Sequence, residues 1–175
     1  MFSSNNIEEL LIFEKWMIEQ FNVTAKKLEK TNNIYKNYRI WFFNTEVSKF
    51  FHEIETPKGD KVLTSFHVPK WIQNNKEYAR EYLKIAYLCE GCNKEYDRTH
   101  PRIKFNQNKE ERLAKEGIVF LNEIKELLDL FNICTTKVST HKGNIRKDGI
   151  ITKELRYRII TKDNSKFYSE IGWLK

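Results

Sequence analysis

Cys89 and Cys92 form a CxxC pair, a spacing that can supply two of the four ligands of a structural zinc ion. No second CxxC or HxxxH follows, and Cys134 lies far away in the sequence. An odd number of cysteines in a chain of this size favours reduced thiols over disulfides or a zinc site. No Gly-rich phosphate loop or Ser–His–Asp spacing is present, and no metal-ligand spacing links the histidines, which are His52, His67, His100 and His141.

The charge of the chain points to an anionic partner. Lys and Arg number 31 against 24 Asp and Glu, a net charge of +7, and the excess lies mainly after Glu90 rather than in a terminal tail. Nucleic acid is the expected partner. The alternative is a charge that reflects genome composition or a hot habitat, in which case the chain is an interaction module whose basicity is incidental.

Size and hydropathy favour a soluble domain. The 175 residues are 40% hydrophobic, enough for one core or two small, closely packed halves. No apolar run approaches the ~20 residues that span a bilayer. Residues 1–9 lack a basic region followed by an apolar stretch. We therefore expect a cytoplasmic protein with no membrane contact.

Periodicity in the first part of the chain predicts a helix, a hairpin and a second helix. Apolar residues recur at helical spacing from Ile7 to Phe21, with Asn5 or Asn6 available as N-cap. Alternating, β-branched and aromatic runs then predict strands. The expected elements are a helix over 7–21, strands over 23–29 and 35–43, a short helix as far as residue 54 with Thr45 as its cap, and a connecting loop through 68–72.

The second part repeats this order after an additional helix. That helix covers 77–89 and ends at Glu90-Gly91. The expected elements after it are strands over 92–96 and 102–106, a helix over 109–131, strands over 134–141 and 155–161 around a basic tip at 143–149, and a helix over 164–173.

Three short matches in corresponding order indicate an internal duplication. Phe21-Asn22-Val23 returns as Phe131-Asn132-Ile133, and Tyr38-Arg39-Ile40 as Tyr157-Arg158-Ile159. Residues 48–54 return as 165–171. The expected domains are an incomplete first repeat over 1–76 and a second repeat over 77–175, about one and a half repeats in all.

Residues 82–91, YLKIAYLCEG, resemble the helix that names the LAGLIDADG homing endonuclease family. PKGDK at 57–61, VPKWI at 68–72 and the closing residues 167–172 resemble segments of its archaeal and intein-borne members. The resemblance implies an α+β fold of the αββαββα type. Two motif helices would pair across a two-fold axis, and antiparallel sheets would form a saddle on double-stranded DNA.

The resemblance also implies the site. Glu90, with Gly91, would bind Mg²⁺ for phosphodiester hydrolysis, and a carboxylate suits this hard cation. Gln107 and Lys162 are the supporting catalytic candidates. DNA contacts are expected from residues of the strands and of a loop tip: Lys94, Arg98, Arg102, Lys104, Gln107, Lys137, Arg146, Lys147, Arg156 and Arg158. Because successive side chains of a strand alternate between its two faces, about half of these residues should point away from the DNA.

Three features of the motif depart from the family pattern. Ile85 stands where the family has a glycine that lets two helices touch, so close packing would rely on Ala86. Leu88 replaces an acidic residue. The chain has one motif acid, so cutting both strands would need a homodimer. The resemblance thus implies a Mg²⁺-dependent site-specific endonuclease. The alternative is a non-cleaving member that binds DNA as a regulator or binds structured RNA as a splicing cofactor.

Overall fold

The computed structural model describes residues 2–4, 6–31, 37–94 and 102–172 and divides the chain into two compact units. Unit 1 is Met1–Thr56 and unit 2 is Pro57–Lys175. Both contain helices and antiparallel strands, so the predicted α+β class agrees with the structure. The boundary differs from the sequence-based division, because residues 57–76 belong to unit 2 rather than to the first repeat.

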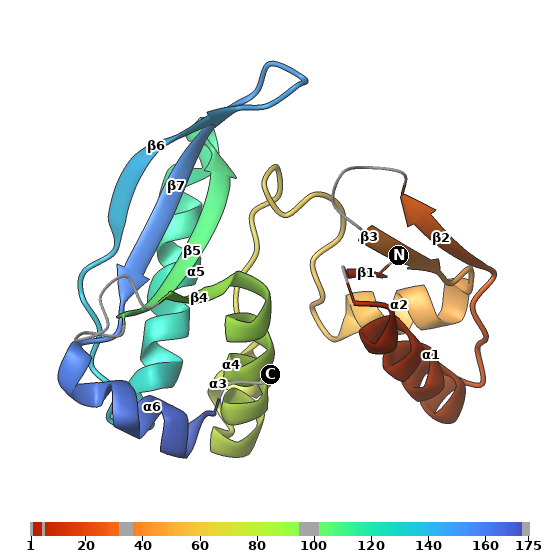
Figure 1. Ribbon diagram of the computed structural model, residues 1–175, viewed down its shortest axis with the longest axis horizontal. Helices are drawn as coiled ribbons and strands as arrows, with labels where there is room; N and C mark the ends of the chain where they lie inside the picture. Colours follow the sequence, from red (N-terminus) through yellow and green to blue (C-terminus); the bar gives the residue numbers. More distant parts are fainter. Residues whose placement is uncertain (1, 5, 32–36, 95–101, 173–175) are drawn as a thin grey trace. The chain divides into compact units, whose positions relative to one another are not determined.

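Unit 1 is a three-stranded antiparallel sheet with two helices (Figure 1). Its sheet order is β1-β3-β2. As predicted, α1 begins after Asn6, whose side chain accepts a hydrogen bond from the amide of Glu8 at 3.0 Å. The next helix is capped by Asn44 rather than Thr45. The elements are β1 (Phe2–Ser4), α1 (Ile7–Phe21), β2 (Lys27–Thr31), β3 (Asn37–Trp41) and α2 (Thr45–Glu53).

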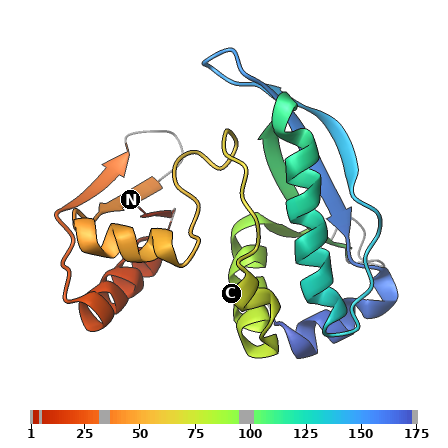
Figure 2. The ribbon, with the colours of Figure 1, turned by 180° about the vertical axis from the view of Figure 1, so that it is seen from behind.

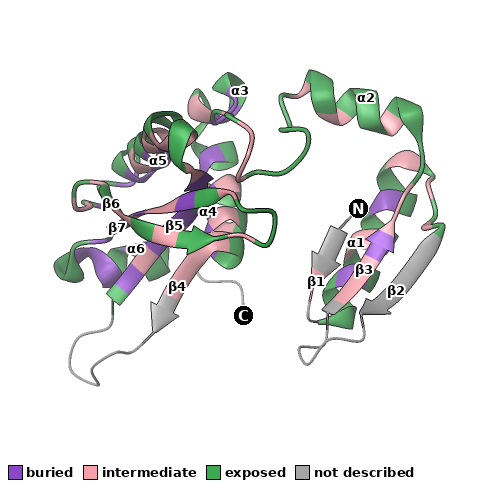
Figure 3. Cartoon of the chain, turned by 90° about the horizontal axis from the view of Figure 1, so that it is seen from above, coloured by how far each residue is buried: buried purple, intermediate pink, exposed green. Residues whose placement is uncertain are grey.

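The core of unit 1 is small. Leu10, Met17 and Ile40 are its buried hydrophobic residues among those described. The Phe21 ring lies 5.4 Å from that of Phe50 and joins α1 to α2, but α2 buries no residue (Figure 3). Aromatic packing between helices therefore supplements a core of few aliphatic side chains.

Unit 2 contains a four-stranded antiparallel sheet of order β4-β5-β7-β6. Helix α5 lies across the face of this sheet that is turned toward the viewer in Figure 2. The elements are α3 (Lys70–Gln73), α4 (Lys76–Glu90), β4 (Gly91–Lys94), β5 (Arg102–Glu110), η1 (Glu111–Leu113), α5 (Ala114–Asp129), β6 (Ser139–Ile145), β7 (Ile151–Arg158), η2 (Thr161–Asp163) and α6 (Asn164–Glu170).

The core of unit 2 lies between this sheet and its helices. Leu83 and Tyr87 of α4, Ile124 of α5 and Phe167 of α6 are buried in one cluster with Phe105 of β5. One face of each strand is thereby covered, and burial of this apolar surface is the main stabilising contribution to the unit.

Strand β5 is longer than the sequence predicted. It pairs with β7 as far as Glu110, opposite Thr152, so the helix that was expected from residue 109 begins at Ala114. The polar residues Gln107 and Lys109 are buried on the face where strand periodicity expects apolar residues, which hid the end of the strand. Within the residues that the structure describes, no helix is long and apolar enough to span a membrane.

Candidate nucleic-acid interface and acidic site

Strand β5 separates two chemically different faces of the sheet. Ile103 and Phe105 are buried toward the helices, whereas Arg102, Lys104 and Asn106 are at least partly exposed. Alternate side chains of a strand point to opposite faces. We call the face that carries the even-numbered residues of β5 the open face.

The register extends the open face across the neighbouring strands. Lys104 is paired with Arg158, and Asn106 with Arg156, on β7. Arg156 is in turn paired with Ser139 on β6. Cross-strand partners lie on the same face, so cationic and amide side chains from separate strands gather on the open face.

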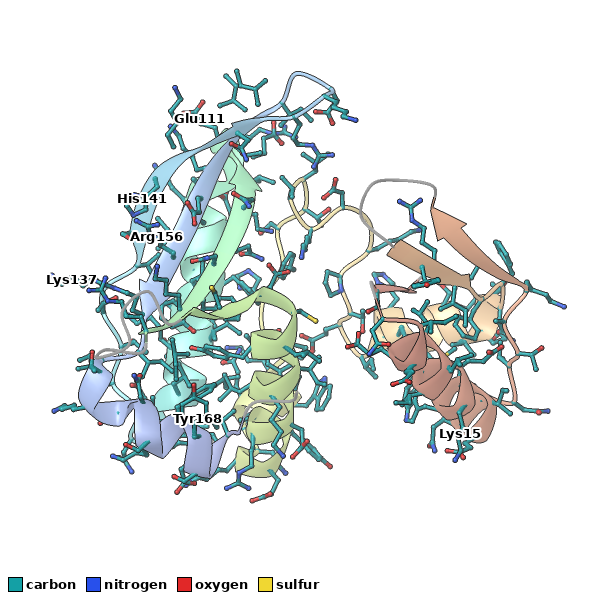
Figure 4. All side chains as sticks on the ribbon, viewed as in Figure 1. Lys15, Glu111, Lys137, His141, Arg156 and Tyr168 are labelled. Atoms are coloured by element: carbon teal, nitrogen blue, oxygen red, sulfur yellow. The ribbon has the colours of Figure 1, made fainter. Side chains whose placement is uncertain are left out.

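Polar interactions organise the β6 side of this face. His141 Nε2 lies 3.0 Å from Ser139 Oγ, and a guanidinium nitrogen of Arg156 lies 3.5 Å from His141 Nδ1. Glu154 lies 3.9 Å from the same guanidinium. Figure 4 labels Arg156, His141 and Lys137 along this side of the sheet. The buried amide oxygen of Asn106 has no hydrogen-bond partner among the described residues.

Apart from Gln107, the sequence-predicted DNA-binding residues divide into three groups. Arg102, Lys104, Arg156 and Arg158 meet on the open face. Exposed Lys137 precedes β6, and exposed Lys147 lies at the loop tip beside Arg146. The backbone of Lys94 pairs with Arg102 at the end of β4, while Arg98 lies outside the described residues.

Gln107 does not share the open face. It is 3% exposed, lies in the helix-facing row with Phe105, and its Oε1 has no hydrogen-bond partner in the structure. A base contact from Gln107 is therefore incompatible with this orientation.

Glu90 ends the helix that the sequence singled out. The Asn75 side chain caps the start of α4 by accepting hydrogen bonds from two backbone amides. Ala79, Leu83 and Tyr87 bury one face of the helix at helical spacing. Gly91 is extended (φ −78°) and begins β4, so it is not the left-handed cap that a terminal glycine suggests. The Glu90 side chain is left at the end of the helix, 24% exposed.

A segment to which the sequence assigned no part in the site brings a cation to Glu90. Lys61, from residues 57–67, forms an ion pair with the Glu90 carboxylate. Asp60 is bound by Arg146 at 2.8 Å, and the amide of Glu110 donates to the carbonyl of Val62 at 3.0 Å. The Val62 amide and the Arg146 guanidinium lower the pKa of the Asp60 carboxyl. The segment is thus held to β5 and to the β6–β7 loop.

Lys109 holds the same segment from inside the unit. Its side chain is 1% exposed, and its ammonium donates to the carbonyls of Lys61 and Thr64 and lies 3.8 Å from the centre of the Phe66 ring. Burial lowers the pKa of Lys109 to about 8. Gly117 of α5 gives this side chain room, because an added Cβ would lie 2.7 Å from Lys109 Cγ. Lys109 therefore fixes the backbone that presents Lys61 to Glu90.

Lys162 is not brought to Glu90. Glu90 precedes Gly91, which is level with Phe105 and Tyr157 in the sheet. Exposed Lys162 follows the end of β7 in η2, toward the opposite end of β4. Among the described residues no three His, Cys, Asp or Glu side chains form a metal-binding group. A cation at Glu90 would thus take most of its ligands from water and substrate, a pattern that Mg²⁺ accepts.

The face of α4 opposite the core carries apolar residues. Tyr78, Ile85 and Leu88 are 52%, 53% and 41% exposed, whereas Ala86 packs against the core cluster. Ala86 is thus turned away from the stripe that a second helix would meet, and Ile85 and Leu88 lie in it.

Comparison with known proteins finds similarity to segments of larger RNA-related proteins. No family model matches the chain. It is 30% identical over 119 residues to the DNA-directed RNA polymerase subunit Rpo1N of Methanocaldococcus jannaschii, covering 66% of this chain and 9% of that protein. It is 26% identical over 125 residues to the tRNA-splicing ligase RtcB of Pyrococcus abyssi, covering 69% and 14%. For RtcB of Methanopyrus kandleri the identity is 31% over 110 residues, covering 61% and 11%. The chain spans roughly a tenth of the length of these relatives, and its distant relatives are nucleic-acid-related proteins.

Proposed function

We propose that this chain is a LAGLIDADG homing-endonuclease-like protein that binds double-stranded DNA along the open face of unit 2 and hydrolyses phosphodiester bonds with Mg²⁺ at Glu90. The observation that carries the proposal is the gathering of Arg102, Lys104, Arg156 and Arg158 on one uncovered sheet face. A two-stranded or larger antiparallel ribbon fits the major groove, where arginine and asparagine read base edges and other cations neutralise phosphates.

The charges on this face favour an anionic ligand. Lys104 and Arg158 are directly opposite each other in the sheet. Two cationic residues at paired positions can together approach one phosphate group. Binding of a phosphate there would release counterions, which strengthens binding at low salt.

Glu90 and Lys61 provide the chemical part of the proposal. Mg²⁺ bound by the Glu90 carboxylate would activate water and stabilise charge on the scissile phosphate. Lys61, which contacts Glu90, would place a second positive charge beside the same phosphate, and Lys109 would hold the segment that carries Lys61. Gln107, buried behind the sheet, and Lys162, beyond the end of β7, are assigned no direct role in this arrangement.

The distribution of the similar segment also supports the proposal. Each match covers more than half of this chain, so the matched stretches overlap one another within it. A polymerase subunit and a ligase are therefore both similar to an overlapping part of this chain, which makes up a small part of either protein. A segment common to two proteins named for different reactions is not what distinguishes their activities. A self-contained DNA-recognising module that is carried by unrelated proteins fits this distribution.

The second candidate function is nucleic-acid binding without cleavage, on DNA or on structured RNA. It is favoured by the Lys61–Glu90 ion pair, in which the ammonium already neutralises the carboxylate, and by the exposure of Leu88 where an acidic residue is expected. Cleavage of both DNA strands needs a second motif carboxylate, which a homodimer through Tyr78, Ile85 and Leu88 of α4 would supply. A protein that binds nucleic acid without cutting it does not need this second carboxylate.

Cleavage assays distinguish the two candidates. Wild type and Glu90→Gln are incubated with Mg²⁺ and DNA duplexes. The duplexes carry the sequences on either side of the gene and the same locus without the gene. Cutting by wild type alone, with equal binding by both proteins, is the result expected for the nuclease. Tight binding of one duplex by both proteins with no cutting would remove the nuclease assignment and leave the binding function.

A further inference from the structure

Units 1 and 2 contain the same arrangement of five elements. In unit 1 the order along the chain is β1, α1, β2, β3, α2, and in unit 2 it is β5, α5, β6, β7, α6. The sheets are β1-β3-β2 and β5-β7-β6, antiparallel throughout. The internal repeat that the sequence predicted is therefore present in the topology as well.

Residue-level details of the two units also correspond. Asn22 after α1 and Asn132 after α5 both adopt a left-handed conformation, with φ 52° and 56°. Ser4 is paired with Tyr38, and Phe105 with Tyr157, at matching positions of the repeated Tyr-Arg-Ile sequence. Strand β1 therefore occupies in unit 1 the place that β5 occupies in unit 2.

Helix α4 and strand β4 of unit 2 have no counterpart among the described residues of unit 1. On its edge away from β7, β5 pairs with β4, Gly91 opposite Phe105. The corresponding edge of β1 pairs with no strand in the described part of unit 1. Helix α4, which precedes β4, packs against α5 in unit 2. An unpaired sheet edge presents backbone donors and acceptors to any extended segment that fits it.

Helix α1 exposes more apolar surface than α5, as expected when no counterpart of α4 packs on it. Five residues before the Asn, each helix has a buried residue, Met17 in α1 (2% exposed) and Leu127 in α5 (1% exposed). The next residue is Ile18 in α1, 40% exposed, but Leu128 in α5, 0% exposed. Helix α1 exposes further large apolar side chains: Ile7, Leu11, Ile12 and Trp16. Exposed apolar surface of this kind marks an interaction site.

We propose that unit 1 is a docking site for a helix–strand segment of another polypeptide, which adds a strand to the free edge of β1 and packs a helix on α1. The interface between α4–β4 and α5–β5 in unit 2 specifies the occupant. Its helix needs apolar residues at the spacing of Ala79, Leu83 and Tyr87, followed without a loop by a short strand that runs antiparallel to β1. The proposal stands on the repeat alone and does not depend on nuclease activity.

A peptide with the sequence of residues 76–94, its two cysteines replaced by serine, is a direct probe. We mix it with the full chain and follow amide hydrogen exchange. Saturable binding should slow exchange at least tenfold in β1 and α1 and leave unit 2 unchanged. The matched control peptides carry Leu83→Lys, at a buried position of α4, or Ile85→Lys, at an exposed one. The first should lose binding and the second should retain it.

Attaching the same segment to the chain through a flexible Gly/Ser linker removes the dependence on affinity in solution, because the effective concentration reaches the millimolar range. Exchange in β1 and α1 should then be slower in the fused chain than in its Leu83→Lys counterpart. Equal exchange in these two fusions overturns the proposal. It is also overturned if the unmodified chain sediments as a dimer with β1 and α1 already protected, because the occupant is then a second copy.

Discussion

The ammonium of Lys61 forms an ion pair with the carboxylate of Glu90, although the two residues are 29 positions apart in the sequence. This pair joins the 57–67 segment to the end of α4, where β4 and the sheet begin. The most suggestive acid in the sequence thus has a cation within its reach, and that cation is carried by backbone anchored to Lys109.

Replacing Lys61 should change how Glu90 binds divalent cations. In Lys61→Met the carboxylate loses its positive neighbour, and Mn²⁺, used as a spectroscopic substitute for Mg²⁺, should bind several-fold more tightly because like charges no longer compete for the same oxygen atoms. Electron paramagnetic resonance titration of free Mn²⁺ measures this. Lys58→Met, an exposed lysine of the same segment, is the control and should bind Mn²⁺ as wild type does. Unchanged Mn²⁺ affinity in Lys61→Met would argue against competition at Glu90.

Lys109 should give the folding free energy a distinctive pH dependence. Its pKa is about 8 in the folded protein against 10.5 for an ordinary lysine, because burial disfavours the charged form. The unfolded chain therefore binds more protons between these values, and stability rises with pH through that window. The burial cost is fully present below pH 8. Relative to Lys109→Met, the free energy of unfolding of wild type should increase by about 1 kcal/mol between pH 8.5 and 9.5.

Urea unfolding of both proteins across this pH range is the measurement, and subtraction removes the contribution of groups that they share. Lys115→Met, at an exposed position of α5, should run parallel to wild type. The difference in unfolding free energy between wild type and Lys109→Met should rise with pH. A difference that is constant or falls with pH would contradict the burial of the Lys109 ammonium against backbone carbonyls.

Gly117 should be intolerant of a methyl group. An added Cβ would lie 2.4 Å from Leu155 Cδ1 and 2.7 Å from Lys109 Cγ, where α5 packs on the sheet. We expect Gly117→Ala to destabilise unit 2 by about 1–3 kcal/mol, despite the gain of up to about 1 kcal/mol in helix propensity. Chemical denaturation compares it with Glu116→Ala, an exposed neighbour that should differ little from wild type. Equal or higher stability of Gly117→Ala would show that α5 can move away.

The two left-handed asparagines should respond alike to substitution. Asn22→Ala and Asn132→Ala place a β-carbon at positive φ without the local hydrogen bonds of asparagine, and each should lower stability by about 1 kcal/mol. The glycine variants at both positions should be as stable as wild type or more stable. Thermal melting of the four variants tests this. A loss of stability at one position with none at the other would contradict an equivalent role of the two asparagines.

Local patterns allowed much of the fold to be predicted from sequence. Helix α1 has the predicted bounds, because its apolar period and the Asn6 cap are both local signals. The internal repeat could also be predicted from the sequence. Asn22 and Asn132 recur in it because both positions adopt a left-handed backbone conformation. Period-2 alternation predicted that about half of the strand cations would share a face. The register places Lys104, Arg156 and Arg158 on one face, and alternation along β5 places Arg102 there too.

The remainder depends on contacts between distant residues. Lys61 and Lys109 gave no local signal, because their partners are a side chain and backbone carbonyls far away in the sequence. Gln107 was assigned to the DNA-facing strands by position, but its parity along β5 turns it toward the helices. Strand β1 was not predicted, because three residues carry too little periodicity and need β3 to form a ladder.

The salt dependence of duplex DNA binding tests most directly whether the open face of unit 2 binds nucleic acid. We compare wild type, the double variant Arg156→Gln/Arg158→Gln, and the control Lys115→Gln on α5. We expect the double variant to bind at least tenfold more weakly in moderate salt, with a slope of log affinity against log salt that is shallower by about 2. Lys115→Gln should match wild type. If the double variant keeps the wild-type affinity and slope, the open face is not where this protein meets DNA.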